Sequence, residues 1–140
     1  MIHILGAGAM GCLWAAHLSH AGIDNLDIDS PGFDCQDIHQ PVGFISTRTS
    51  RNAFVHFTLS SSFLPNVDTN KAFKIPLATS DSLTAPLDTL LVCTKSYDAL
   101  PALQHLQNSI TKNTKIILFQ NGLGSQYQIL KNFPNNPVFA

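Results

Sequence analysis

The sequence predicts an α/β fold: a doubly wound, mainly parallel sheet with helices on both faces. Short apolar runs typical of buried strands alternate with stretches whose apolar residues recur every three or four positions, as in amphipathic helices. Glycines follow the first apolar run, where a strand would turn into a helix. At 140 residues the chain suits one hydrophobic core, so we expect residues 1–140 to form one domain.

The first β-α-β unit is expected over residues 1–29. Residues 1–5 (MIHIL) predict a buried strand, and Gly22 is placed to end the helix that follows. Residues 25–29 (NLDID) alternate apolar and polar side chains and predict the second parallel strand. The apolar positions of the helix are Met10, Leu13, Trp14, Leu18 and Ala21.

Residues 30–74 are less regular, because prolines and glycines separate short β-rich pieces such as VGFIST and AFVHFTL. We expect strands or a hairpin here. The serines at 60–62 lack the glycine pattern of a nucleophile elbow, which favours a loop.

The second half returns to alternating strands and helices. Residues 88–94 and 115–119 predict buried strands, and helices are expected from Asp98 to about residue 108 and from residue 123 to Pro134. With Asp98 as N-cap, Pro101 would sit in the first helical turn, where its missing N–H costs nothing. The final VFA has strand character, so we expect a last strand cut short in a piece of a longer protein. The apolar residues of the two helices are Leu100, Leu103 and Ile110, then Leu123, Tyr127, Leu130 and Phe133.

Composition excludes several classes of protein. The net charge is −1 and no lysine or arginine precedes Arg48, so a nucleic-acid partner is not expected. Without a basic residue before its first apolar run, the chain does not begin like a signal peptide. No apolar run is long enough for a membrane helix. We therefore expect a cytoplasmic protein. Only 12% of residues are charged, against roughly 25% in soluble proteins, which is consistent with an apolar face covered by another domain. We expect no disulfide and no zinc site from Cys12, Cys35 and Cys93, and no metal site from His17 and His20.

Residues 6–11 form the pattern G-x-G-x-x-G between a predicted strand and a predicted helix. In a Rossmann-like fold the first glycine permits a tight turn, the second lets backbone approach a pyrophosphate, and the third lets helix pack on strand. A dinucleotide is therefore favoured over a flavin, over S-adenosylmethionine and over a turn without a ligand. The candidate cofactor-binding residues are Gly6, Ala7, Gly8, Ala9, Met10 and Gly11.

Three further residues are candidates for the same site. Asp29 lies 18 residues beyond Gly11, near the spacing of an acid that binds a ribose 2′-hydroxyl, which favours NAD; a solvated strand-end aspartate is the alternative. Lys95 and Asn121 follow the strands expected at 88–94 and 115–119, whose ends should neighbour the glycine loop. The alternatives are a solvated lysine and an ordinary Asn-Gly turn.

The chain resembles the N-terminal domain of the ketopantoate reductase (2-dehydropantoate 2-reductase) family. The matching segments are ILGAGAMGCLWAAHL, LLVCTKSYDALPAL and IILFQNGLGSQYQIL. The resemblance implies an oxidoreductase of pantothenate biosynthesis that reduces ketopantoate with NADPH, with residues 6–11 on the pyrophosphate and Lys95 and Asn121 near the nicotinamide ribose and the keto-acid substrate. It also implies a second, helical domain that supplies the catalytic lysine. Residues 1–140 would then hold no catalytic residue and be inactive alone.

The chain departs from the family at the 2′-phosphate site. The family usually carries an arginine after its second strand, but the spacing from Gly22 places Ser30 there, beside Asp29. Arg48 or Arg51 would have to serve instead, so NADP(H) follows from the resemblance while NAD(H) stays open. Two other functions also stay open: a dinucleotide-sensing module without chemistry, and a reductase of another keto acid.

Overall fold

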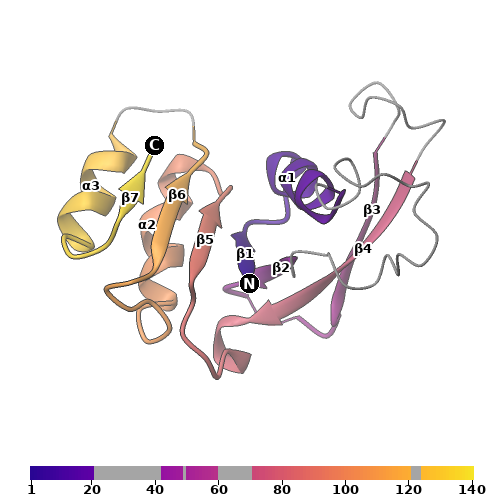
Figure 1. The fold of residues 1–140 in the computed structure, drawn as a ribbon, viewed down its shortest axis with the longest axis horizontal. Helices are drawn as coiled ribbons and strands as arrows, with labels where there is room; N and C mark the ends of the chain where they lie inside the picture. Colours follow the sequence, from indigo (N-terminus) through magenta and orange to yellow (C-terminus); the bar gives the residue numbers. More distant parts are fainter. Residues whose placement is uncertain (21–41, 49, 60–70, 121–123) are drawn as a thin grey trace, which may run out of the picture.

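The computed structural model describes residues 1–20, 42–48, 50–59, 71–120 and 124–140. These residues form a seven-stranded sheet in the order β3-β4-β2-β1-β5-β6-β7, with helices on both faces (Figure 1). Neighbouring strands are parallel except for β3 and β4, which pair antiparallel. The predicted α/β, Rossmann-like architecture is confirmed.

The central strand is β1 (Ile2–Leu5), which pairs with β2 on one side and with β5 on the other. The next helix in the chain, α1, follows β1 after the glycine loop. The remaining strands are β2 (Val42–Ser46), β3 (Phe54–Leu59), β4 (Lys71–Thr79), β5 (Thr89–Val92), β6 (Lys115–Leu118) and β7 (Val138–Phe139). The helices are α1 (Ala9–His20), α2 (Ser96–His105) and α3 (Ser125–Asn132), with a short 3₁₀ turn at Ser80–Ser82.

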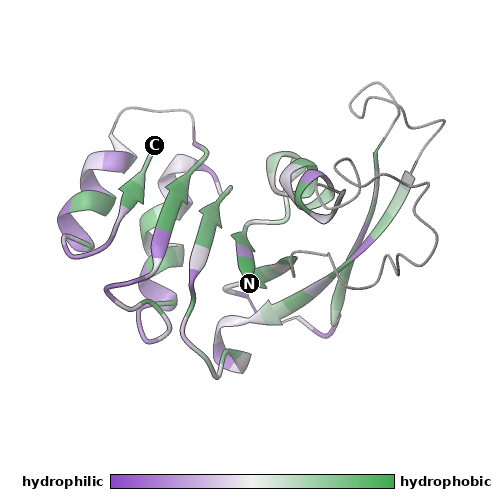
Figure 2. Cartoon of the chain, viewed as in Figure 1, coloured by the Kyte–Doolittle hydropathy of each residue, from purple (hydrophilic) through white to green (hydrophobic). Residues whose placement is uncertain are grey.

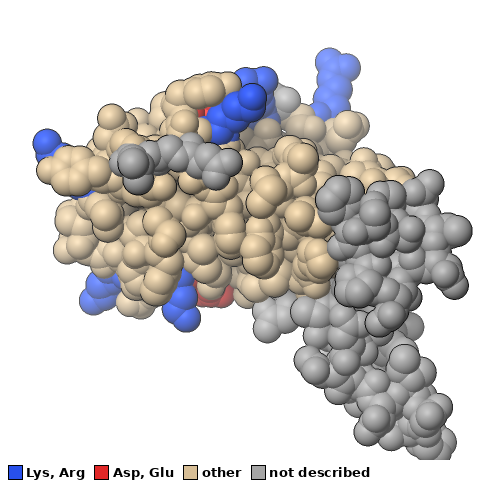
Figure 3. Space-filling view, turned by 90° about the horizontal axis from the view of Figure 1, so that it is seen from above, with Lys and Arg blue, Asp and Glu red and all other residues tan. Residues whose placement is uncertain are grey.

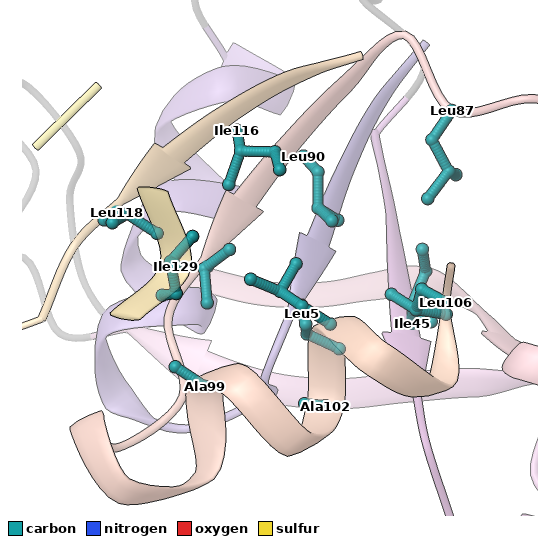
Figure 4. Packing of buried hydrophobic residues seen from close by; sticks show 12 residues of the cluster. Leu5, Ile45, Leu87, Leu90, Ala99, Ala102, Leu106, Ile116, Leu118 and Ile129 are labelled. Atoms are coloured by element: carbon teal, nitrogen blue, oxygen red, sulfur yellow. The ribbon is translucent and has the colours of Figure 1, made fainter. Parts of the chain in front are cut away.

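Alternate residues of the strands build a core on each face of the sheet. Ile4 of β1 packs with Ala15 of α1, whereas its neighbour Leu5 packs with Ala99 and Ala102 of α2. Figure 4 shows the second cluster, in which α2 turns its alanines toward the sheet. Among the described elements, β1, β5 and β6 are largely hydrophobic, as Figure 2 shows.

The second strand expected at 25–29 lies outside the described residues. Beside β1 the structure places β2, from the VGFIST segment, and β2 pairs in parallel with β1 and β4. The AFVHFTL segment forms β3, which pairs with β4 and not with β2. No strand was predicted at the position of β4, whose interior Pro76 is unusual for a paired strand.

The α2 helix starts earlier than predicted. Its N-cap is Lys95, so Asp98 lies inside the first turn and Pro101 lies within the helix. The prediction of Asp98 as N-cap was wrong, because the helix begins immediately after the turn that follows β5. Leu103 is fully buried as expected, and Leu100 and Ile110 pack at the edge of the same core.

The last helix, α3, and the last strand, β7, lie where the sequence predicts them. In α3, however, the buried apolar residue is Ile129, whereas Tyr127 and Leu130 are 72% and 49% exposed. The predicted final strand is β7, which pairs in parallel with β6. Residues 60–62 lie outside the described part of the chain.

Candidate functional site

The glycine loop joins β1 to α1 and is packed between neighbouring elements. Gly6 has a φ angle of 104°, which glycine adopts without strain. A β-carbon on Gly6 would lie 2.9 Å from the amide nitrogen of Thr94, so the loop rests on the residues that follow β5. A β-carbon on Gly11 would overlap the carbonyl oxygen of Gly6. The first and third glycines therefore allow strand, loop and helix to touch.

Gly8, the second glycine of the motif, faces open space. No atom lies within 4 Å of the position that a β-carbon would take there, and Ala7, Gly8 and Ala9 are all exposed. The loop leads into the first turn of α1, whose amide groups lack partners within the helix and favour an anion. The residues present thus fit a pyrophosphate that approaches the backbone at Gly8.

A cavity of about 410 Å³ opens between the glycine loop, α2 and the residues that follow β2. Apolar side chains come from the strands on this side of β1, including Ile45 and Leu77, and α2 contributes Pro101 and His105. Gly6 and Ala7 also line this cavity. The lining also holds polar and charged side chains, among them Asp98 of α2. A cavity of this mixed character beside a phosphate-binding loop suits the adenosine half of a dinucleotide.

Arg48 lines this adenosine-side cavity. It lies two residues beyond β2, in a turn that begins at Ser46. Arg51, the other arginine nearby, instead lines a neighbouring cavity with β3 residues. The sequence alone did not distinguish between the two arginines, because the second strand was expected at residues 25–29.

A second cavity, also of about 410 Å³, lies on the other side of the glycine loop. It is lined by Gly8, Met10, Lys95, Phe119 and Gln120. The neighbouring positions of β1, β5 and β6 bring these residues together, which confirms the expectation that the three strand ends are adjacent. Lys95 is exposed here and occupies the N-cap position of α2, without a side-chain capping hydrogen bond.

Gln120 links the ends of β5, β6 and α3. Its side-chain amide donates to the Thr94 hydroxyl at 3.4 Å, and its carbonyl oxygen accepts from the Ser125 hydroxyl at 3.3 Å. Thr94 in turn lies against Gly6. This network supports the glycine loop. It was not predicted from the sequence, because hydrogen bonds between distant residues leave no local pattern.

The cysteines near the loop are poor nucleophiles. Burial raises the pKa of Cys93 to about 11, and burial also raises the pKa of Cys12, whose thiol donates to the Ala7 carbonyl at 3.6 Å. Both thiols therefore stay protonated near neutral pH. Within the described residues no group of three or more potential ligands is arranged to hold a metal, so His17 has no such partners.

Three predicted site residues, Asp29, Ser30 and Asn121, lie outside the described residues. Among the helices that are described, none is long and apolar enough to cross a membrane. Figure 3 shows one face of the molecule, whose described surface is mainly uncharged, with lysine and arginine side chains at separate places.

Known proteins resemble this chain over nearly its whole length. The family model for ketopantoate reductase PanE/ApbA matches residues 2–140. A 2-dehydropantoate 2-reductase from Streptococcus pyogenes serotype M3 is 23% identical over 138 residues, which cover 99% of this chain and 38% of the relative. The chain thus spans well under half the length of the curated relatives it matches, and corresponds to their N-terminal part.

Solved structures share the same fold. A 2-dehydropantoate 2-reductase from Methylococcus capsulatus has a TM-score of 0.67 at 20% identity, covering 98% of this chain and 38% of that one. A dimeric ketopantoate reductase from Staphylococcus aureus has a TM-score of 0.60 at 19% identity, covering 99% and 41%. A D-mandelate dehydrogenase bound to NADH and anilino(oxo)acetate has a TM-score of 0.65 at 20% identity, covering 95% and 37%. By its family match, this chain belongs to the ketopantoate reductase PanE/ApbA family.

Proposed function

We propose that this chain is the NADP(H)-binding part of a reductase that converts ketopantoate to pantoate. The observation that carries the cofactor proposal is the position of Arg48, which lines the same cavity as Gly6 and Ala7. An arginine placed after the strand beside β1 can bind a 2′-phosphate through two parallel N–H groups. This residue supplies the arginine that the sequence spacing left unassigned.

The proposed roles of the other residues follow the two cavities. Residues 6–11 would hold the pyrophosphate, and Arg48 the 2′-phosphate. Lys95 and Asn121 would lie near the nicotinamide ribose and the keto-acid substrate, Asn121 by family resemblance alone. When bound, the nicotinamide supplies the hydride. Asp29 and Ser30 remain predicted cofactor contacts, and a cytoplasmic location belongs to the same proposal.

Binding measurements on the 140-residue chain test the cofactor. By titration calorimetry we expect NADPH to bind at least about tenfold more tightly than NADH, equivalent to about 1.4 kcal/mol. Arg48→Gln should abolish this preference, whereas Arg51→Gln, in the neighbouring cavity, should keep it. Equal or weaker binding of NADPH by the unmodified chain would overturn the NADP proposal, and binding of neither dinucleotide would overturn the site.

The substrate proposal is tested with the protein that carries this chain at a length matching its relatives. NADPH oxidation is followed with ketopantoate and with a panel of other 2-keto acids. A second candidate, reduction of another 2-keto acid, is favoured by the fold shared with D-mandelate dehydrogenase. Ketopantoate as the best substrate by kcat/KM supports the first candidate, and preference for an aryl 2-keto acid supports the second.

A further inference from the structure

The backbone of Arg48 is held by one side chain. The Arg48 amide donates to the Ser46 hydroxyl oxygen at 3.1 Å, and the Ser46 hydroxyl donates to the Arg48 carbonyl at 3.0 Å. One hydroxyl thus occupies both hydrogen-bonding groups of the same residue. These two bonds fix the direction in which the chain leaves β2.

Ser46 is itself firmly placed. It is the last residue of β2 and aligns with Thr79 of the neighbouring strand β4. The preceding residue, Ile45, is 2% exposed and belongs to the core beneath α2. The hydroxyl of Ser46 therefore connects the turn at Arg48 to the rigid part of the sheet.

The side chain of Arg48 needs such support. It is exposed, and a long exposed side chain loses much conformational entropy when it is held against a ligand. Among the described residues that line the adenosine-side cavity, no lysine and no arginine other than Arg48 is present. A displaced Arg48 backbone would therefore leave a 2′-phosphate there without its charged partner.

We propose that Ser46 is a positioning residue for dinucleotide selection, which holds the Arg48 backbone so that the guanidinium stays beside the cavity and favours a 2′-phosphate. This inference rests on the proposed function, because it assigns the 2′-phosphate to Arg48. It predicts that Ser46 affects NADPH binding without affecting NADH binding. A purely structural role would change both affinities together.

The experiment compares two substitutions of nearly equal shape at a strand position, Ser46→Thr, which keeps the hydroxyl, and Ser46→Val, which removes it. Ser46→Ala is the third variant, and melting temperatures identify any variant that does not fold. The matched control is Ser82→Ala. Ser82 makes the same pair of bonds with the Thr79 backbone, at 3.0 and 2.9 Å, away from both cavities.

Dissociation constants for NADPH and NADH are measured for each variant of the 140-residue chain. Ser46→Val and Ser46→Ala should weaken NADPH binding about fivefold, the loss expected for about one hydrogen bond, and leave NADH binding unchanged. Ser46→Thr and Ser82→Ala should keep the NADPH preference. Unchanged NADPH binding in the hydroxyl-free variants, or equal losses for both cofactors, would overturn the role of Ser46. Absence of any NADPH preference in the unmodified chain would instead overturn the proposed function.

Discussion

Gly11 touches Gly6 so closely that a β-carbon on Gly11 would overlap the Gly6 carbonyl oxygen. The same β-carbon would lie 3.3 Å from the ring of Phe44, which is fully buried in β2. Neither the backbone nor the core ring can move away easily. Helix α1 therefore approaches the sheet at a distance that only glycine permits.

Gly11→Ala should destabilise the fold. An added methyl group in a packed contact costs about 1–3 kcal/mol. Because the group in the way is the Gly6 backbone carbonyl, which cannot turn aside, we expect the free energy of unfolding to fall by about 3 kcal/mol. Urea denaturation followed by circular dichroism measures it. Gly124→Ala is the control, because no atom lies within 4 Å of its β-carbon position. A Gly11→Ala variant as stable as the control would contradict the packing described.

Gly8→Ala should separate binding from folding. Its β-carbon would meet no protein atom within 4 Å, so we expect an unchanged urea midpoint. The added methyl group would stand where a pyrophosphate approaches the loop, and NADPH affinity should fall more than tenfold. Calorimetry measures the affinity. Unchanged NADPH affinity would show that the phosphates lie elsewhere.

Gln120→Leu should weaken the proposed nicotinamide half of the site more than the adenosine half. The substitution removes both hydrogen bonds, to Thr94 and from Ser125, so NADPH affinity should fall about fivefold. Binding of 2′,5′-ADP, which lacks the nicotinamide half, should fall less. Gln104→Leu, at an exposed position of α2, is the control. Equal losses for NADPH and 2′,5′-ADP would indicate a general disturbance of the loop.

Alkylation of Cys93 should show its raised pKa. The thiolate is the reactive form, and with a pKa of about 11 its fraction grows about tenfold per pH unit across pH 8 to 10. An unfolded thiol, with its usual pKa of 9.0, approaches full ionisation over the same range. The folded thiol keeps its proton to a higher pH than the unfolded thiol. The free energy of unfolding should therefore fall as the pH rises above 9. Iodoacetamide labelling read by peptide mass spectrometry measures the rate, and a plateau near pH 9 would be the contrary result.

Local sequence patterns predicted the part of the fold whose partners are close in sequence. The run MIHIL followed by three glycines specified strand, loop and helix, and the strands before Lys95 and Asn121 were recognised from uninterrupted apolar residues. The identity of the strand beside β1 could not be obtained this way. VGFIS is one of several short β-rich runs, and only its pairing with β1 in three dimensions identifies it as a neighbouring strand.

The start of α2 shows a second limit. Asp98 is a good N-cap by residue type, and Pro101 is well tolerated in a first turn, so local preference favoured that start. The structure begins the helix at Ser96, because the chain must leave β5 and cover Leu5 with Ala99 and Ala102. Burial of Ala99, Ala102 and Leu103 in this core offsets the local cost of an interior proline.

The central position of β1 has a consequence for synthesis. Its residues leave the ribosome before those of both partner strands, because β2 follows only at residues 42–46 and β5 only at 89–92. Until Val92 has been added, at least one edge of this apolar strand has no native partner, and such edges are where nascent chains associate wrongly. The glycine loop can rest against Thr94 only after that point. Dinucleotide would then bind the completed sheet in preference to earlier intermediates, so its presence in the cell would favour chains that have finished folding.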